Sequence, residues 1–252
     1  MRLHAATDGR GPRLVLVHGF HQNRNCWGPL AADLARDHEV VRVDGPGHGR
    51  SSAVTADPWQ TADLLAAAGG VATYIGYSMG GRLALHAALA HPSQVRALVV
   101  IGATAGIDDP AARRARVERD ELLARRIERE GVERFTSEWL AQPIFAGIPE
   151  PMRFREERLT NTAPGLASSL RRAGTGAQDP LWEKVPDIDG PVLVVAGAND
   201  DKFTAEGRRL VEAIGARADL AVIPDAGHGP HLERPAATTT VVRAWLEATR
   251  PA

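Results

Sequence analysis

The sequence predicts an α/β fold in which a mostly parallel central sheet is flanked by helices and carries an inserted helical cap. Two observations support this prediction. Short continuous apolar runs alternate with segments whose apolar residues recur at helical spacing, and residues 111–172 interrupt that alternation with helical spacing alone. Continuous apolar runs are typical of strands buried on both faces, and their alternation with helices indicates parallel strands joined by crossover connections.

Length and composition fit one soluble globular unit. The chain has 252 residues, 44% hydrophobic and 24% charged, with a formal net charge of -1. One α/β domain can hold this length, and the balanced charge gives no reason to expect nucleic acid or a membrane surface as a partner. Cys26 is the only cysteine, so an internal disulfide is impossible. With no apolar signal core at the N-terminus, we expect a cytoplasmic protein.

Six apolar runs are expected to form the strands of the core, and a helical stretch is expected between each strand and the next. The segment before the third strand is short, and the last helix closes the chain. We expect strands at 14–17, 40–43, 71–75, 95–101, 191–197 and 220–223, and helices at 27–35, 83–90 and 236–248.

The cap is expected between the fourth and fifth strands. Residues 111–172 contain thirteen arginines and ten acidic residues, a net charge of 13 − 10 = +3, and apolar side chains at helical spacing such as Phe135 and Trp139. Most of these charges should lie paired on solvated helices. We therefore expect a core of residues 1–106 and 173–252, with a cap of residues 107–172.

A strand, a sharp turn and a helix meet at residues 76–80, which read GYSMG. This G-x-S-x-G pattern between a strand and a helix predicts a nucleophile elbow at Ser78. Glycine is needed at positions 76 and 80 because strand and helix must approach closely around a strained serine. The pattern is short, and an ordinary glycine-rich turn would also produce it, so the rest of the chain decides between the two interpretations.

Two further loops at the expected carboxyl ends of strands carry the partners that a serine nucleophile needs. They supply Asp200 and His228, so that Ser78, Asp200 and His228 follow one another in the order typical of this arrangement. An imidazole can take the hydroxyl proton, and a carboxylate can orient that imidazole. Asp201, Asp225 and His231 are the alternatives. Asp225 is too close to His228 in sequence to reach behind its ring easily, and the sequence contexts G-x-N-D and A-G-H favour Asp200 and His228.

An oxyanion hole is expected from two backbone amides. The N–H of Met79 follows the nucleophile directly, and the loop 18–20 after the first strand supplies the N–H of Phe20. His18 is expected to support that loop, and residues 44–51 are expected to serve the architecture of a neighbouring loop.

The whole chain resembles the α/β-hydrolase superfamily. Within it, the chain resembles the synthases that make 2-succinyl-6-hydroxy-2,4-cyclohexadiene-1-carboxylate in menaquinone biosynthesis. The triad motifs are shared with many hydrolases, whereas Arg82 after Gly-Gly, the cap arginine spacing and the GTGAQ stretch are more specific. His21 and Gln22 depart from the family pattern, which more often has a small hydroxyl residue there. The resemblance is carried by residues 16–20, 76–82, 106–120, 139–145, 169–178, 197–203 and 226–228.

This resemblance implies a lyase and a set of substrate-binding residues. In that family, proton abstraction beside a carbonyl expels pyruvate from a cyclohexene bearing three carboxylates, and the triad serine acts as the base. The residues that match substrate contacts of the family are Tyr77, Arg82, Arg116, Trp139 and Arg158.

The resemblance leaves two other classes of protein open. A carboxylesterase or C–C bond hydrolase acting through an acyl-serine would explain the triad equally well, but would leave Arg82 and the cap arginines without a task. A binding protein without catalysis would be expected to have a damaged triad. We expect a small polycarboxylate substrate, no nucleic-acid or membrane partner, and no metal or organic cofactor, because no Cys/His ligand spacing is present.

Overall fold

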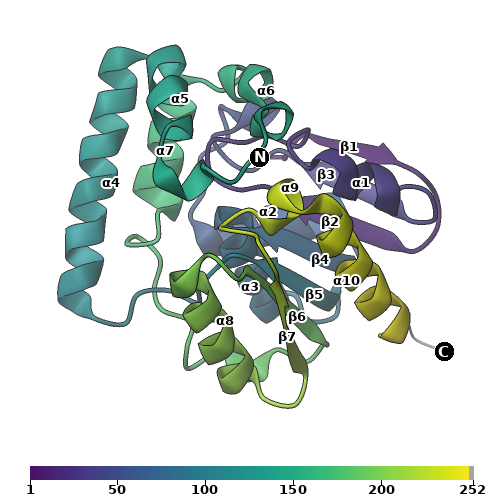
Figure 1. Ribbon diagram of the computed structural model, residues 1–252. Helices are drawn as coiled ribbons and strands as arrows, with labels where there is room; N and C mark the ends of the chain where they lie inside the picture. Colours follow the sequence, from purple (N-terminus) through teal and green to yellow (C-terminus); the bar gives the residue numbers. More distant parts are fainter. Residues whose placement is uncertain (250–252) are drawn as a thin grey trace.

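The computed structural model describes residues 1–249 and confirms the predicted α/β class (Figure 1). Seven strands form one sheet in the order β1-β3-β2-β4-β5-β6-β7, in which only β1 runs antiparallel to its neighbour. The strands are β1 Ala5–Asp8, β2 Arg13–Val17, β3 Glu39–Val43, β4 Ala72–Tyr77, β5 Val95–Ile101, β6 Val192–Gly197 and β7 Ala218–Ile223.

Helices cover both faces of the sheet. On one face α1 and α10 share an apolar cluster with the sheet, and on the other α2, α3 and α8 do so. Short α9 follows β7. These helices are α1 Gly28–Leu34, α2 Pro58–Gly69, α3 Met79–Ala90, α8 Asp201–Ile214, α9 Pro230–Glu233 and α10 Pro235–Ala248.

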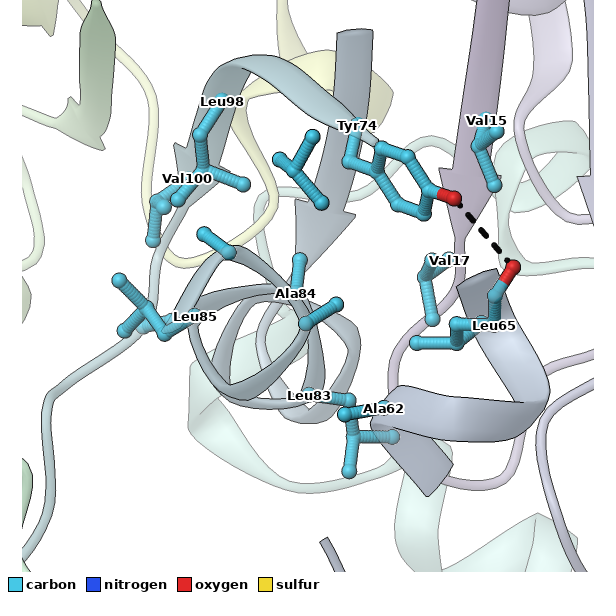
Figure 2. Close-up of a cluster of buried hydrophobic side chains, with 14 of the residues drawn as sticks. Val15, Val17, Ala62, Leu65, Tyr74, Leu83, Ala84, Leu85, Leu98 and Val100 are labelled. Carbon is cyan, nitrogen blue, oxygen red and sulfur yellow. Dashed lines mark hydrogen bonds between the residues drawn. The ribbon is translucent and has the colours of Figure 1, made fainter. Parts of the chain in front are cut away.

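The face under α2 and α3 shows why these residues form the core (Figure 2). Side chains from β2, β4 and β5 interdigitate with those of both helices, and nearly all are completely buried. The one polar group is the Tyr74 hydroxyl, which donates to the carbonyl of Leu65 at 3.3 Å and to that of Gly70 at 3.0 Å. Burying a phenol hydroxyl that has such acceptors costs little free energy, whereas burying one without a hydrogen-bond partner would destabilise the fold.

Between β5 and β6 the chain forms helices only. Figure 1 shows α4, α5 and α7 standing together beside the sheet, and α4 packs along α7. We retain as a proposal that this insertion is a cap with boundaries 107–172; its last helix extends one residue further. The insertion contains α4 Pro110–Glu130, α5 Val132–Leu140, α6 Arg155–Leu159 and α7 Ala163–Ala173.

The structure corrects the expected elements at several points: among others, α3 begins four residues and β7 two residues earlier than expected. Strand β1 was not predicted, because it is a short edge strand with two exposed residues and no apolar run. Strand β4 continues two residues beyond the predicted end, since Gly76 and Tyr77 pair with β5, and Val71 lies outside it. The segment before β4 looked short, yet it holds the twelve-residue helix α2, which begins with a capping box at Asp57.

Within residues 1–249, none of the helices combines the length and apolar character that a membrane crossing requires.

Candidate active site

Ser78 sits between the last residue of β4 and the first residue of α3 in a strained backbone conformation. Its φ is 52° and its ψ is −110°, a region of backbone conformation that residues other than glycine rarely enter. A Cβ on Gly76 would lie 2.3 Å from the carbonyl oxygen of Gly80, and one on Gly80 would lie 1.8 Å from that of Val17. The close approach predicted for both glycines is therefore present, and no larger residue fits without backbone movement.

The structure brings Ser78, His228 and Asp200 into one hydrogen-bonded chain. His228 Nε2 lies 3.2 Å from Ser78 Oγ, and His228 Nδ1 lies 3.0 Å from Asp200 Oδ2. An ionised carboxylate can only accept, so Nδ1 carries the proton and Nε2 is free to accept from the serine hydroxyl. Burial opposes ionisation of Asp200, but hydrogen bonds from His228 and the Phe203 N–H outweigh it and lower the pKa of Asp200.

The three alternatives considered from the sequence lie elsewhere, and Asp225 is exposed in the turn after β7. Asp201 is exposed at the first position of α8, while Asp200 caps that helix by accepting from the Phe203 N–H. His231 is buried with its ring 4.4 Å from the Tyr77 ring, and burial lowers its pKa to about 3. The geometry thus pairs Ser78 with His228 and leaves His231 a neutral core residue.

Phe20 and Met79 both line the space over Ser78. Met79 begins α3, so its N–H has no acceptor within the helix. The loop before Phe20 is supported as expected, because His18 Nδ1 lies 2.8 Å from the Gly19 carbonyl and His18 Nε2 accepts from the Gly45 N–H at 3.0 Å. The oxyanion-hole role of the two amides stays a prediction.

A cavity of about 240 Å³ opens above the serine, between the carboxyl ends of the strands and the inserted helices. This is the usual place for a ligand site in a parallel α/β sheet. Every site residue expected from the sequence except Asp200 contributes to its lining, and four of the lining side chains are cationic: Arg82, Arg116, Arg158 and Lys202.

Arg82 is buried and is held by two hydrogen bonds from its guanidinium group. One guanidinium nitrogen donates to Gln178 Oε1 at 2.6 Å and another to the Ala173 carbonyl at 2.8 Å. Burial, with repulsion from Arg116, lowers the pKa of Arg82 to about 10, so it still carries its charge at neutral pH. Because both partners are uncharged, the positive charge of Arg82 is not neutralised by them.

The two cap arginines are held differently. Arg116 forms an i,i+4 ion pair on α4, with its Nε 2.8 Å from Asp120 Oδ1. Arg158 is almost completely buried and donates to the carbonyls of Arg153 at 2.7 Å and His21 at 3.3 Å. Arg158 therefore also holds the loop after Phe20, a structural task that its sequence position did not reveal.

Tyr77 and Trp139 form apolar walls with polar ends. Burial raises the pKa of the Tyr77 phenol, which keeps it protonated. The Trp139 ring lies edge-on to the Phe20 ring and tilted to the Phe145 ring, with centroid distances of 5.4 and 5.7 Å. Its buried Nε1 has no acceptor within residues 1–249.

Several further polar residues line the cavity and were not identified from the sequence, Lys202 and Asp120 among them. Gln178, which accepts from Arg82, was not identified either. Lys202 follows Asp200 by two residues, and Gln178 ends the GTGAQ stretch, so both signals were visible. The directions in which these side chains point were not visible in the sequence, because they depend on packing. Among residues 1–249 no group of three or more His, Cys, Asp or Glu side chains could hold a metal ion; cofactor independence stays a prediction.

A strained serine on an elbow, a histidine and aspartate in line with it, and a mostly parallel seven-stranded sheet define a class of α/β enzymes. Residues 14–241 match the family described as the Alpha/beta hydrolase family, and the chain belongs to this family.

Within the family, the similarity extends to particular enzymes. The chain is 35% identical to the 2-succinyl-6-hydroxy-2,4-cyclohexadiene-1-carboxylate synthase of Enterobacter sp. (strain 638), covering 90% of this chain and 88% of that one. The solved structure of MenH from S. aureus superposes with a TM-score of 0.91 at 26% identity, covering 98% and 99%. A thermophilic esterase from Thermogutta terrifontis, solved with malate bound, gives a TM-score of 0.84 at 27% identity, covering 99% and 94%.

Proposed function

We propose that this protein is a carbon–oxygen lyase of menaquinone biosynthesis. It eliminates pyruvate from 2-succinyl-5-enolpyruvyl-6-hydroxy-3-cyclohexene-1-carboxylate and leaves 2-succinyl-6-hydroxy-2,4-cyclohexadiene-1-carboxylate. The similarity to the Enterobacter synthase supports this reaction. The structural observation that carries it is the cavity, where a triad-like chain of side chains opens toward four cations.

The reaction follows from comparing substrate with product. The proton at ring carbon 2, beside the succinyl ketone, is removed and a C2=C3 double bond forms. The original C3=C4 double bond moves to C4=C5, the bond from C5 to the ether oxygen breaks, and enolpyruvate leaves and becomes pyruvate. No oxidant or second substrate is required.

Each triad member has a task in this sequence of events. Ser78 Oγ takes the C2 proton as its own proton passes to His228 Nε2, and Asp200 stabilises the imidazolium that forms. The amides of Phe20 and Met79 stabilise the oxyanion that develops on the succinyl carbonyl. His228 then returns the proton to the departing enolpyruvate.

The cations bind the carboxylates of the substrate. A carboxylate that leaves water for a cavity needs a charged partner, and the planar fork of arginine can hold it bidentately. We assign this role to Arg82, Arg116 and Arg158, with Tyr77 and Trp139 shaping the walls around the ring. A neutral substrate without carboxylates would not use the positive charge of these arginines.

The decisive experiment mixes the purified protein with the enolpyruvyl substrate and follows pyruvate through a lactate dehydrogenase assay. Pyruvate should appear in equal amount with the diene. Absence of pyruvate release at micromolar enzyme would reject the lyase.

A second candidate is an esterase or C–C bond hydrolase that forms an acyl-serine, and the similarity to the Thermogutta esterase favours testing it. Mixing the protein with a p-nitrophenyl ester separates the two functions. A hydrolase shows a burst of nitrophenol followed by turnover, and intact-protein mass spectrometry finds acylated Ser78. The lyase releases pyruvate with no covalent adduct on Ser78.

A further inference from the structure

The carboxylate of Glu233, at the end of α9, lies beneath the loop that carries His228. Glu233 Oε2 accepts from the Gly227 N–H at 2.7 Å, and Glu233 Oε1 accepts from the Gly229 N–H at 3.0 Å. These two residues are the immediate neighbours of His228 on either side. Hydrogen bonds from backbone amides to an ionised carboxylate are short and strong, so one buried side chain holds the loop at both flanks of the histidine.

Two glycines lie close to this carboxylate. A Cβ on Gly227 would lie 3.1 Å from Oε1, so the loop backbone is already in close contact with it. On the far side, a Cβ on Gly147 would lie only 2.2 Å from Oε2. Gly147 belongs to the inserted segment, where neighbouring Phe145 and Ile148 pack with Leu232 of α9. The inserted segment thus lies close to the carboxylate that holds the histidine loop.

Helix capping accounts for only half of this arrangement. Gly229 is the N-cap of α9, so its N–H is a normal partner for a side chain of that short helix. Gly227 lies outside the helix, on the other side of His228, and capping gives no reason to bind its N–H. The hydrogen bond from the Gly227 N–H is explained if Glu233 fixes the backbone on both sides of His228.

We propose that Glu233 is a positioning residue for His228. By holding both flanking amides, it fixes the backbone from which the imidazole reaches Ser78 on one side and Asp200 on the other. The inference rests on the role given to His228 in the proposed function. A small displacement of a catalytic base lowers the rate steeply while leaving substrate binding largely intact.

The test compares Glu233→Gln with Glu212→Gln, a control at an exposed position of α8. The amide of glutamine keeps the size but can accept at one oxygen only, and its NH₂ group faces an N–H donor. For Glu233→Gln we expect kcat to fall about 10- to 100-fold with KM changed less than about threefold. The control should match the wild type.

Two further variants separate positioning from general structure. Added to His228→Ala, Glu233→Gln should change the residual rate less than about twofold, because residues that act through one another are not additive. Gly147→Ala leaves Glu233 in place but displaces its carboxylate, so it should also lower kcat more than it raises KM. This variant keeps the proposal testable if Glu233→Gln fails to fold.

Labelling of Ser78 by a fluorophosphonate gives a readout that does not need the enolpyruvyl substrate. Glu233→Gln should slow the labelling rate about as much as kcat, since labelling also needs His228. Wild-type protein that is labelled but releases no pyruvate would refute the proposed function alone. Normal labelling and normal kcat in Glu233→Gln, or an equal loss in the His228→Ala background, would refute the positioning role.

Discussion

At the scale of single residues, two adjacent aspartates illustrate how much one position matters. Asp200 ends the loop after β6 and lies 3.0 Å from His228, whereas its neighbour Asp201 begins α8 and faces solvent. A carboxylate behind an imidazole selects the tautomer that leaves Nε2 free to accept a proton. Only the first of the two aspartates can do this.

We expect Asp200→Asn to lower kcat for pyruvate release by roughly 10³- to 10⁴-fold, because an amide cannot hold the required tautomer. Asp201→Asn should remain within about twofold of the wild type. Steady-state kinetics at pH 7.5 measures both. A large loss of kcat in Asp201→Asn together with a small loss in Asp200→Asn would show that Asp200 is not the acid of the triad.

Arg82 is the residue that distinguishes a lyase for a polyanion from a hydrolase of neutral esters. Arg82→Ala should cost about 2–5 kcal/mol of transition-state stabilisation, the range for truncating one member of a desolvated charge pair. Arg82→Lys should recover part of this loss, because one ammonium cannot bind both the carboxylate and the Gln178 oxygen as the fork does.

The measurement is kcat/KM for pyruvate release, with Arg208→Ala on the exposed side of α8 as the control. Any hydrolysis of a small neutral ester should change little in either Arg82 variant. Undiminished pyruvate release in Arg82→Ala would count against the lyase.

At the scale of elements, the loop after β2 is connected to the inserted helices through His21. This residue has a φ of 62°, and its backbone carbonyl accepts from Arg158 and Asn161 of the insertion. Its ring Nε2 lies 3.0 Å from the hydroxyl of Thr136 on α5, which itself donates to the Val132 carbonyl. Nε2 is therefore the donor, and the departure of His21 from the family pattern has a local structural reason.

Removing that acceptor should loosen the connection between loop and helix. Thr136→Val keeps the shape but leaves the buried Nε2–H unpaired, which should cost about 1–3 kcal/mol of unfolding free energy. Thr136→Ser keeps the hydroxyl and should cost less than half as much. Urea unfolding of the three proteins measures both values, and equal losses in the two variants would assign the effect to packing alone.

At the scale of the whole molecule, several histidines are buried in their neutral form. Burial lowers the pKa of His48 and of His231 to about 3 and that of His86 to about 4. At pH above 6.5 these imidazoles are neutral in both the folded and the unfolded chain. Below it, the unfolded chain binds protons that the folded chain cannot accept, so acid favours unfolding.

Stability should therefore fall as the pH decreases from about 6.5 toward 4. Each buried histidine contributes up to about 1.4 kcal/mol per pH unit in that window. Urea unfolding at pH 7.5, 6.0 and 5.0 gives the slope, and His86→Gln should make it shallower by about one such contribution. A stability that stays constant from pH 7.5 to 5.0 would contradict this expectation.

The sequence by itself determined the α/β class, most strand positions and the order of Ser78, Asp200 and His228. These features are local: apolar runs indicate buried strands, and glycines at 76 and 80 mark a backbone approach that no side chain can enter. The sequence was insufficient where strand formation depends on pairing with a distant strand. Strand β1 lacks an apolar run and becomes a strand only through its antiparallel pairing with β3.

Only the tertiary structure decided which way the polar side chains of the site point. Arg158 reaches the carbonyl of His21, 137 positions away in the chain, and Gln178 holds Arg82 from 96 positions away. No sequence pattern marked Glu233, and only the fold brings its carboxylate to the amides on both sides of His228. Side-chain direction depends on the packing of distant segments against one another, and a local pattern contains no record of that packing.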